Sequence, residues 1–378
     1  MTIDYMVVGG GIAGASAGHH LARYGRVLLV EMEQVPGHHS TGRSAALFSE
    51  YYGGPQVRAL TRASREFLLG PPAGFAEHPL LTPRGVLSLC PPGDEAEFEA
   101  ELRAGAEVDP PAREIDPAGI PDICPIVRPG WARRAMVKPA ARDVDVAALH
   151  QGYLRGIRDA GGTVARLTRV RSLRRERGRW RADTDAGELT ARVVVNAAGA
   201  WADQVAVSAG VAPSGLTPLR RTAFLVDAPP GVDPARWPLV GDVAGTFYVK
   251  PESGHLLVSP VDATPTPPGD VRPDDLDVAL GAARLEAATT VTVRRIRHAW
   301  AGLRTAAPDD VPVIGPDPSA PGFLWLAGLS GYGVQTAPAA GALLAALAAG
   351  VEPPVDPAPY APGRAALSAP APTDRRRT

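Results

Sequence analysis

The chain has 378 residues, of which 45% are hydrophobic and 21% charged, as is typical of a globular protein with one large domain or two joined ones. Its 39 basic and 40 acidic residues leave a formal charge of −1, which disfavours binding to nucleic acid or to an anionic membrane. No apolar run approaches the roughly 18 residues of a transmembrane helix, and the N-terminus carries no secretory pattern, so we expect a cytoplasmic protein without a transmembrane segment. Cys90 and Cys124 form no CxxC pair, which agrees with a reducing compartment.

The N-terminal region predicts one βαβ unit. Residues 4–8 have the pattern of a short buried strand, an alanine-rich stretch with helical spacing runs to Gly25, and residues 27–30 form a second buried strand that ends at Glu31. A right-handed crossover through the helix makes the two strands parallel.

The six residues from Gly9 to Gly14 fit the GxGxxG pattern, and they lie between the first strand and the helix. The first glycine permits a tight turn, the second lets the backbone approach a pyrophosphate, and the third allows close helix–sheet contact. Glu31 follows at about 20 residues from the glycines, where a carboxylate accepts hydrogen bonds from ribose hydroxyls. The pattern predicts a dinucleotide site but does not separate FAD from NAD.

The rest of the chain predicts a second region of mixed helix and sheet, then a β-rich region, then a return to the first sheet. Asp145 is a plausible N-cap for a helix over 146–157. Strands are predicted at 163–167, 170–173, 180–182, 193–195, 223–226, 247–249, 256–259, 291–294 and 323–327, and a last helix at 335–349. We therefore expect an α/β (α+β) fold, with a Rossmann-like dinucleotide-binding domain built from discontinuous segments and a β-sheet-rich substrate domain.

Five segments resemble the D-amino acid oxidase (DAO) superfamily of FAD-dependent oxidoreductases. They are residues 36–46, 195–201, 247–251, 300–304 and 331–335, which together span nearly the whole chain. Within the superfamily, these segments and residues 55–61 and 149–153 look most like the bacterial FAD-dependent D-arginine dehydrogenases. We assign residues 1–82, 138–214 and 300–352 to the FAD-binding domain, residues 83–137 and 215–299 to the substrate domain, and residues 353–378 to a flexible tail rich in Pro and Arg.

The resemblance implies FAD as the cofactor. Some members attach FAD to a cysteine near the segment of Arg304, but residues 303–306 contain none, so we expect non-covalent binding. The residues that the resemblance places around FAD are Gly9, Gly11, Ala13, Gly14, Glu31, Met32, Ser40, Thr41, Gly42, Arg43, Ser44, Ala45, Ala46, Val170, Gly199, Ser330, Gly331, Tyr332, Gly333, Val334 and Gln335. The start of the last helix would offer N–H groups and a positive dipole end to the flavin.

The resemblance also places Tyr52, Arg221, Tyr248 and Arg304 around a substrate carboxylate, and the backbone carbonyl of Gly331 near the substrate amine. A guanidinium binds a carboxylate with two parallel hydrogen bonds, and phenols add neutral donors. The Cα hydrogen would then pass to the flavin as a hydride, and the resulting imine would hydrolyse to a 2-oxo acid and ammonia. The implied substrate pocket consists of Ser44, Leu47, Ser49 and Val86.

Two of these pocket residues depart from the D-arginine dehydrogenase pattern. Leu47 stands where those enzymes have a histidine, and Val86 where they have a glutamate. Without the glutamate a substrate guanidinium would be buried unpaired, at a cost of several kcal/mol. We therefore expect a neutral or apolar D-amino acid as substrate, unless Glu50 points inward and supplies a carboxylate.

Three alternatives remain open on the sequence. The first is an oxidase of glycine, sarcosine-type or cyclic secondary amines, the second is a flavin-binding biosynthetic or regulatory protein without turnover, and the third is a nicotinamide dehydrogenase. The electron acceptor is unknown. The histidines, including the pairs His19-His20 and His38-His39, make no metal-binding pattern, so no metal is expected, and His39 is expected to pack or hydrogen bond near the cofactor.

Overall fold

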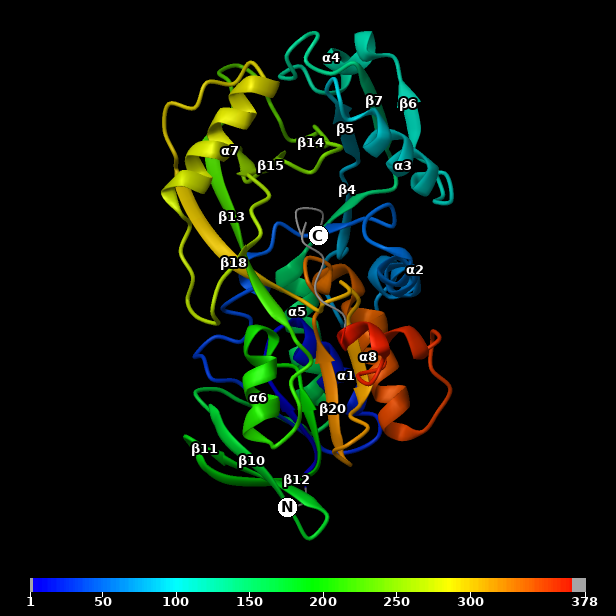
Figure 1. Ribbon diagram of the computed structural model, residues 1–378, viewed down its shortest axis with the longest axis vertical. Coiled ribbons are helices and arrows are strands. Elements are labelled where there is room, and N and C mark those ends of the chain that lie inside the picture. The colour runs from blue at the N-terminus through cyan, green and yellow to red at the C-terminus, as the bar shows by residue number, and fades with distance from the viewer. Residues whose placement is uncertain (1–2, 369–378) are drawn as a thin grey trace.

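The computed structural model describes residues 3–368, and for Ser368 the backbone alone. The chain forms two lobes that follow one another along the long axis of the molecule (Figure 1). Each lobe is built on its own sheet, and strands β13 (Thr217–Asp227) and β18 (His298–Ala306) run from one lobe towards the other. The mixed α/β class and the pairing of a Rossmann-like lobe with a sheet-rich lobe are confirmed.

The sheet of the first lobe has the order β10-β11-β12-β1-β2-β9, with β20 paired to β12 and β19 to β20. Strands β1, β2, β9, β12 and β20 are parallel, whereas β10, β11 and β19 join in antiparallel fashion. The strands are β1 (Ile3–Val8), β2 (Val27–Val30), β9 (Thr163–Ala165), β10 (Val170–Glu176), β11 (Arg179–Thr184), β12 (Gly187–Asn196), β19 (Val313–Pro316) and β20 (Phe323–Ala327). The predicted βαβ unit is confirmed, and a strand lies at each of the later positions predicted for this sheet, from 163–167 to 323–327.

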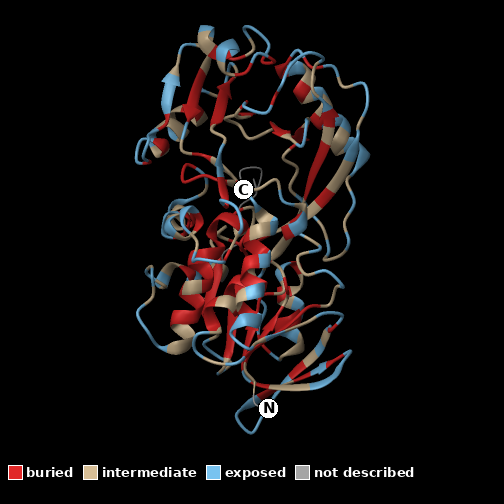
Figure 2. Cartoon of the chain, turned by 180° about the vertical axis from the view of Figure 1, so that it is seen from behind, coloured by how far each residue is buried: buried red, intermediate tan, exposed pale blue. Residues whose placement is uncertain are grey.

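Helices cover both faces of this sheet because its central strands are apolar on both sides. The helices of this lobe are α1 (Ile12–Leu21), α2 (Pro55–Leu69), α5 (Val146–Asp159), α6 (Ala202–Ser208) and α8 (Gly333–Ala349). Asp145 caps α5 as predicted, since its Oδ1 accepts from Ala148 N at 2.8 Å. Buried residues gather in this sheet and in the helices α1, α5 and α8, as Figure 2 shows.

The sheet of the second lobe has the order β17-β13-β16-β15-β14-β5-β7-β6, with β18 along β13. Its further strands are β5 (Val86–Cys90), β6 (Arg113–Ile115), β7 (Arg134–Lys138), β14 (Leu239–Asp242), β15 (Tyr248–Glu252), β16 (His255–Ser259) and β17 (Thr264–Pro265), and its helices are α3 (Glu95–Gly105), α4 (Ile120–Ile123) and α7 (Asp275–Ala288). One face carries an apolar cluster that includes Phe224, Val249 and Leu285 of α7. Because side chains alternate along a strand, Ala223 and Tyr248 lie on the opposite face.

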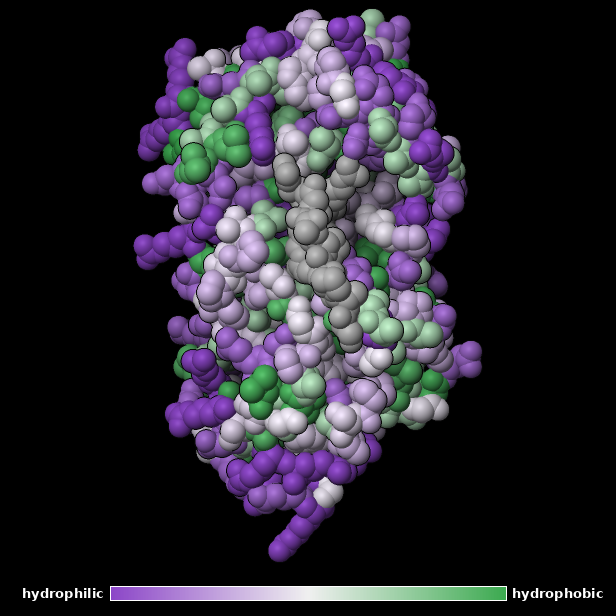
Figure 3. All heavy atoms as spheres, viewed as in Figure 1, coloured by the Kyte–Doolittle hydropathy of each residue, from purple (hydrophilic) through white to green (hydrophobic). Residues whose placement is uncertain are grey.

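A third, small sheet has the strand order β3 (Leu47–Phe48), β8 (Arg142–Val144) and β4 (Leu81–Pro83). Short 3₁₀ turns occupy Thr41–Arg43, Pro117–Gly119, Gly199–Trp201, Ala358–Tyr360 and Ala365–Ser368. Charged residues gather at the far end of the first lobe, over β10 to β12 (Figure 3). There Arg174 of β10 and Arg181 of β11 both pair with Glu176 of β10 and with Glu188 of β12. Within residues 3–368 no helix has the length and apolar character needed to cross a membrane.

Two predictions about elements are wrong. Residues 291–294 form no strand, because Val293 N donates to the Glu286 side chain instead of to a neighbouring strand. The loosely held tail is wrong for residues 353–368, since Tyr360 is 1% exposed and its hydroxyl donates to Gln56 O at 2.8 Å. Arg364 adds an ion pair with Asp309. The ring of Tyr360, the guanidinium of Arg364 and the apolar side chains of Val355 and Leu367 anchor this Pro-rich segment without any periodic pattern. Residues 369–378 lie outside the described residues.

The domain assignment remains a proposal. The interval 300–352 was given to the FAD-binding domain, yet β18 pairs with β13 from Thr217↔Ala306 to Leu225↔His298. The second sheet therefore extends across the assigned boundary at residue 300, and the chain returns to the first sheet only at β19.

Candidate active site

A cavity of about 470 Å³ lies where the strands β1, β2, β12 and β20 end and the helices α1 and α8 begin. Its lining residues include Glu31, Met32 and Val170 as well as Leu303 and Ser330. Ligands of doubly wound sheets bind outside the carboxyl ends of the strands, which is where this cavity opens.

The glycine turn after β1 forms one wall, and its three fingerprint glycines have different surroundings. Gly9 has a φ of +107°, and a Cβ there would lie 2.5 Å from Ala197 O. At Gly14 a Cβ would lie 1.9 Å from Gly9 O, so both positions exclude a side chain for reasons of packing. At Gly11 the nearest atom would be Thr41 Oγ1 at 3.4 Å, and this glycine lines the cavity. Gly11 therefore keeps space open for a ligand.

Hydrogen bonds fix this wall from several sides. Glu31 accepts from Gly10 N at 2.7 Å and from Glu33 N at 2.8 Å, and Thr41 Oγ1 accepts from Ile12 N at 2.9 Å. His150 Nε2 lies 2.8 Å from Gly10 O, which holds the turn from the side of α5. The N–H groups at the start of α1 and the carboxylate of Glu31 are thus held in place for an anion and for ribose hydroxyls.

A smaller cavity of about 80 Å³ adjoins the first, and Ser40, Thr41, Leu303, Ser330 and Gly333 line both. It is lined in addition by residues of the segment 36–46, of β13, β15 and β18 and of the start of α8, namely Arg43, Ser44, Ala45, Arg221, Ala223, Tyr248, Gly302, Arg304, Gly331 and Val334. Arg221 and Arg304 come from the neighbouring strands β13 and β18, where Arg221 pairs with Gly302. Two guanidinium groups therefore face one small cavity.

The environment keeps both guanidinium groups charged. Burial, with the charge of Arg304, lowers the pKa of Arg221 to about 10, which still leaves it protonated at neutral pH. Burial alone would lower the pKa of Arg304, but the phenols of Tyr52 and Tyr248 outweigh it and raise that pKa. The ring of Tyr52 packs on that of Tyr332 at a centroid distance of 4.8 Å, and burial raises the pKa of Tyr332. The site is a cationic cavity with phenols at its edge.

Arg304 also explains the glycine at position 331. A Cβ on Gly331 would lie 2.5 Å from Arg304 Nη1, so the guanidinium passes directly beneath the backbone at the start of α8. The carbonyl of Gly331 was proposed to meet the substrate amine, and its residue does line the small cavity.

The structure brings most of the predicted site residues together. The residues proposed for FAD or substrate that line one of the two cavities are Gly9, Gly11, Ala13, Glu31, Met32, Ser40, Thr41, Arg43, Ser44, Ala45, Val170, Gly199, Arg221, Tyr248, Arg304, Ser330, Gly331, Gly333 and Val334. Those that line neither are Gly14, Gly42, Ala46, Tyr52, Tyr332, Gln335, Leu47, Ser49 and Val86.

Several of the residues outside the cavities support the site from behind. Gln335 accepts from Ser49 N and donates to Thr61 Oγ1, both at 3.0 Å, so it joins β3, α2 and α8. Val86 lies in β5 between Lys138 and Leu239 of its neighbouring strands.

Glu50, which could have supplied a carboxylate to the substrate pocket, lines neither cavity. It is 4% exposed and pairs with the guanidinium of Arg65 on α2. The idea that Glu50 substitutes for the missing pocket carboxylate is therefore wrong, because its charge is already balanced by a neighbouring cation.

The sequence reasoning missed one wall of the large cavity. It is lined by Thr168, Arg169, Arg171, Trp201, Gln204 and Ser208. The last three belong to the turn Gly199–Trp201 and to α6, directly after the segment 195–201 that carried part of the family resemblance. That segment was the available signal, but the inward face of a short helix cannot be read from so few residues.

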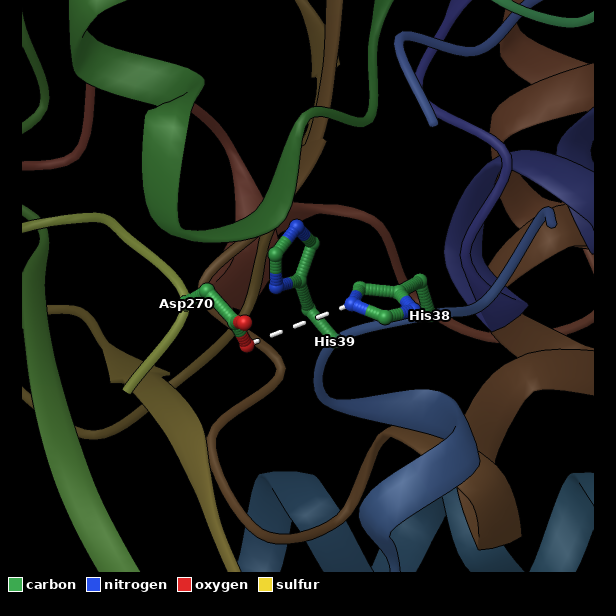
Figure 4. Close-up of side chains that lie close together, drawn as sticks. All are labelled: His38, His39 and Asp270. Atoms are coloured by element: carbon green, nitrogen blue, oxygen red, sulfur yellow. Dashed lines mark ion pairs between the residues drawn. The ribbon is translucent and has the colours of Figure 1, made fainter. Parts of the chain in front are cut away.

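The structure places His38 and His39 of the segment 36–46 against Asp270 of the second lobe (Figure 4). Their ligand atoms lie within 4.8 Å of one another, a spacing that a metal ion also requires. Arg43 pairs with Asp270, however, and its Nη2 lies 3.4 Å from His38 Nε2. A guanidinium thus already provides the positive charge for this carboxylate, and a metal ion would be repelled by it.

The same cluster joins the lobes at the rim of the large cavity, which His38 and His39 both line. His39 Nε2 lies 3.0 Å from Glu33 Oε1, and the ring packs on Trp201 at a centroid distance of 4.7 Å. The prediction that His39 packs and hydrogen bonds beside the cofactor space agrees with this geometry.

Together these features define a two-lobed dinucleotide-binding oxidoreductase. The large cavity, the carboxylate of Glu31, the N-termini of α1 and α8 and the space left by Gly11 fit FAD. The chain belongs to the DAO family of FAD-dependent oxidoreductases, whose model matches residues 4–347, and FAD is its cofactor.

Similar proteins include amine-oxidising enzymes. The chain is 29% identical to the glycine oxidase of Pseudomonas putida over 388 residues, which is 96% of this chain and 99% of that protein. It is 25% identical to the human mitochondrial dimethylglycine dehydrogenase over 93% of its own length and only 43% of that protein. The crystal structure of glycine oxidase from Geobacillus kaustophilus matches with a TM-score of 0.82 at 24% identity, covering 96% of this chain and 98% of that one.

These comparisons confirm the superfamily named from the sequence. The finer resemblance to D-arginine dehydrogenases stays a prediction. The chain spans less than half the length of the dimethylglycine dehydrogenases that it matches.

Proposed function

We propose that this protein oxidises the C–N bond of a small amino acid that carries a free carboxylate. The main support for this proposal is the small cavity of about 80 Å³, which Arg221, Arg304 and Tyr248 line beside the cofactor space. Arg221 and Arg304 present two guanidinium groups to this one small cavity, and a carboxylate matches the fork of a guanidinium.

When bound, FAD supplies the chemistry of a two-electron acceptor that takes up a hydride. The chain's own residues hold the substrate for this step. The guanidinium groups fix the carboxylate, and the carbonyl of Gly331 receives the amine. The Cα–H bond then breaks with its electron pair leaving as hydride, while the nitrogen lone pair forms the C=N bond. Orientation of Cα is the main contribution of the protein, and water afterwards hydrolyses the imine to a 2-oxo acid and ammonia.

The size and polarity of the small cavity favour a substrate with a small neutral side chain or none. Its apolar lining residues include Ala45, Ala223 and Val334, and among the described residues that line it there is no Asp or Glu. A substrate guanidinium would have no counter-ion there. The similarity to glycine oxidases and dimethylglycine dehydrogenases points the same way. We therefore propose glycine, its N-methylated forms and small neutral D-amino acids as the substrate class, and D-arginine as a poor substrate.

Anaerobic bleaching of the bound flavin tests the proposal. The purified holoenzyme is mixed with glycine, sarcosine, L-proline, D-arginine and both enantiomers of alanine and leucine, and the loss of flavin absorbance is followed by stopped flow. We expect rapid reduction by glycine, sarcosine or D-alanine, with the L-enantiomers at least about tenfold slower. Faster reduction by D-arginine than by all of these would refute the pocket argument, and an unbleached flavin with every amine would refute amine oxidation itself. Peroxide release in air then distinguishes an oxidase from a dehydrogenase.

A further inference from the structure

The segment that follows β16 is locked onto β13 immediately beside Arg221. Asp262 accepts from Thr222 N at 2.6 Å and from Thr222 Oγ1 at 3.0 Å through its two carboxylate oxygens. Ser259 Oγ donates to Thr222 O at 2.7 Å and accepts from Val261 N at 3.2 Å. All the polar groups of Thr222 are therefore bonded to this one segment.

The backbone of the segment reaches the guanidinium of Arg221. Nε of Arg221 donates to the carbonyl oxygen of Asp262 at 2.6 Å. The residue before it, Val261, has a φ of +54°, which is rare and unfavourable for a β-branched side chain. Because Ser259 holds one end of this turn and the Asp262 side chain holds the other, both through Thr222, they keep the Asp262 carbonyl directed at Nε. A hydrogen bond to Nε fixes the plane of a guanidinium, and with it the direction in which the fork meets a carboxylate.

We propose that Asp262 is a positioning residue, which holds Arg221 in the orientation that binds the substrate carboxylate. The inference rests on the proposed function, since it concerns how the same cavity recognises its ligand. Asp262 acts through Arg221, and it does not itself line either cavity. Its side chain is 5% exposed, so water cannot replace the bonds to Thr222.

A matched control is available on the adjacent arginine. Arg220 precedes Arg221 on β13 and points to the other face of the strand, where it pairs with Asp277 Oδ2 at 2.7 Å and its Nε lies 3.7 Å from Asp262 Oδ2. The control therefore shows what weakening the ion pairs of Arg220 does by itself. Asp277→Asn removes one carboxylate from an arginine pair of the same lobe without touching Arg221. Asp262→Asn is the conservative variant, because its carbonyl oxygen still accepts from Thr222 N and its amide can donate to the threonine hydroxyl.

The experiment measures acetate binding to the holoenzyme through the perturbation of the flavin spectrum, with acetamide as the uncharged probe of the same shape. We expect Asp262→Ala to raise the dissociation constant of acetate at least about tenfold, while acetamide changes less than twofold. Asp262→Asn should restore most of the acetate affinity, and Asp277→Asn should resemble the wild type. Glycine turnover, where present, should show the loss in KM more than in kcat. Thr222→Val, which deletes only the hydroxyl, serves if Asp262→Ala does not fold, with an expected loss of about threefold.

The outcomes separate the two proposals. If Asp262→Ala, or Thr222→Val in its place, binds acetate as tightly as the wild type, the positioning role is overturned and the proposed function stays intact. An equal loss for acetate and acetamide overturns it too, because that indicates general damage to the cavity. A wild-type holoenzyme to which neither acetate nor any amino acid binds overturns the proposed function, and the positioning role with it.

Discussion

Ser16 donates its hydroxyl to the carbonyl oxygen of Ala337 at 2.6 Å, which joins the first helix of the chain to the last described one. The helices approach closely here because Gly341 has no side chain, and a Cβ at that position would lie 2.1 Å from Ser16 Oγ. Since α1 and α8 both begin at the cofactor cavity, this contact also sets the separation of their N-terminal ends.

Gly341→Ala should therefore destabilise the fold. The new methyl group overlaps Ser16 Oγ and approaches its carbonyl carbon to 2.9 Å, so the helices must separate. Overpacking of this kind costs about 1–3 kcal/mol, which urea unfolding of the apoprotein will show. The control is Gly119→Ala, whose Cβ would meet nothing within 4 Å and whose φ of −85° suits alanine. Equal stability of the two variants would contradict the close contact.

Two glycines of the same turn should respond differently to alanine. Gly14→Ala places its methyl 1.9 Å from Gly9 O and should lower the stability of the apoprotein, whereas Gly11→Ala meets only Thr41 Oγ1 at 3.4 Å and should leave it nearly unchanged. The Gly11 methyl extends into the cavity instead, so FAD affinity should fall at least about tenfold. Thermal unfolding of the apoproteins and fluorescence titration with FAD separate the effects. Tight FAD binding by Gly11→Ala would show that the cofactor does not pass this position.

Replacement of Arg304 by methionine should weaken carboxylate binding while FAD stays bound. Loss of one partner from a buried, hydrogen-bonded charge pair costs about 2–5 kcal/mol, which is roughly a 30-fold to several-thousandfold weaker affinity. The KM for glycine or the dissociation constant of acetate measures the change. Arg297→Met is the matched control, since Arg297 forms an exposed pair with Asp227 near the start of the same strand. Similar constants for both variants would remove Arg304 from the site.

Acid should destabilise the protein through the histidines of α1. Burial, with the charges of His19 and Arg23, lowers the pKa of His20 to about 3, and burial lowers that of His19 to about 4. Because the folded values lie below the unfolded value near 6.5, this stability is present above pH 6.5 and is lost as the pH falls towards 4 and 3. At pH 5 His20 alone should cost about 2 kcal/mol relative to pH 7.

The measurement is urea unfolding at pH 7 and pH 5 for the wild type and for His20→Phe. The ring of His20 already packs against that of Phe67, at a centroid distance of 6.2 Å, so a phenylalanine keeps an aromatic group there. The variant should lose less stability between the two pH values. An unchanged pH dependence would place the acid-sensitive group elsewhere.

The amino-acid sequence by itself determined the dinucleotide-binding half of this protein. A buried strand, a glycine turn and a helix in immediate succession depend on local backbone geometry, so Gly9, Gly11 and Glu31 were recognisable along with the parallel strands around them. The match of Arg221, Tyr248 and Arg304 to a family pattern suggested a carboxylate site, but their meeting depends on the pairing of β13 with β18 and of β15 with β16.

The tertiary structure decided which neighbours each side chain has. It left Leu47 and Val86 outside both cavities, paired Glu50 with Arg65, turned α6 towards the cofactor space and anchored Tyr360. None of these follows from spacing along the chain, because the direction of a side chain at a sheet edge or in a loop depends on strand register and on contacts between residues far apart in the sequence.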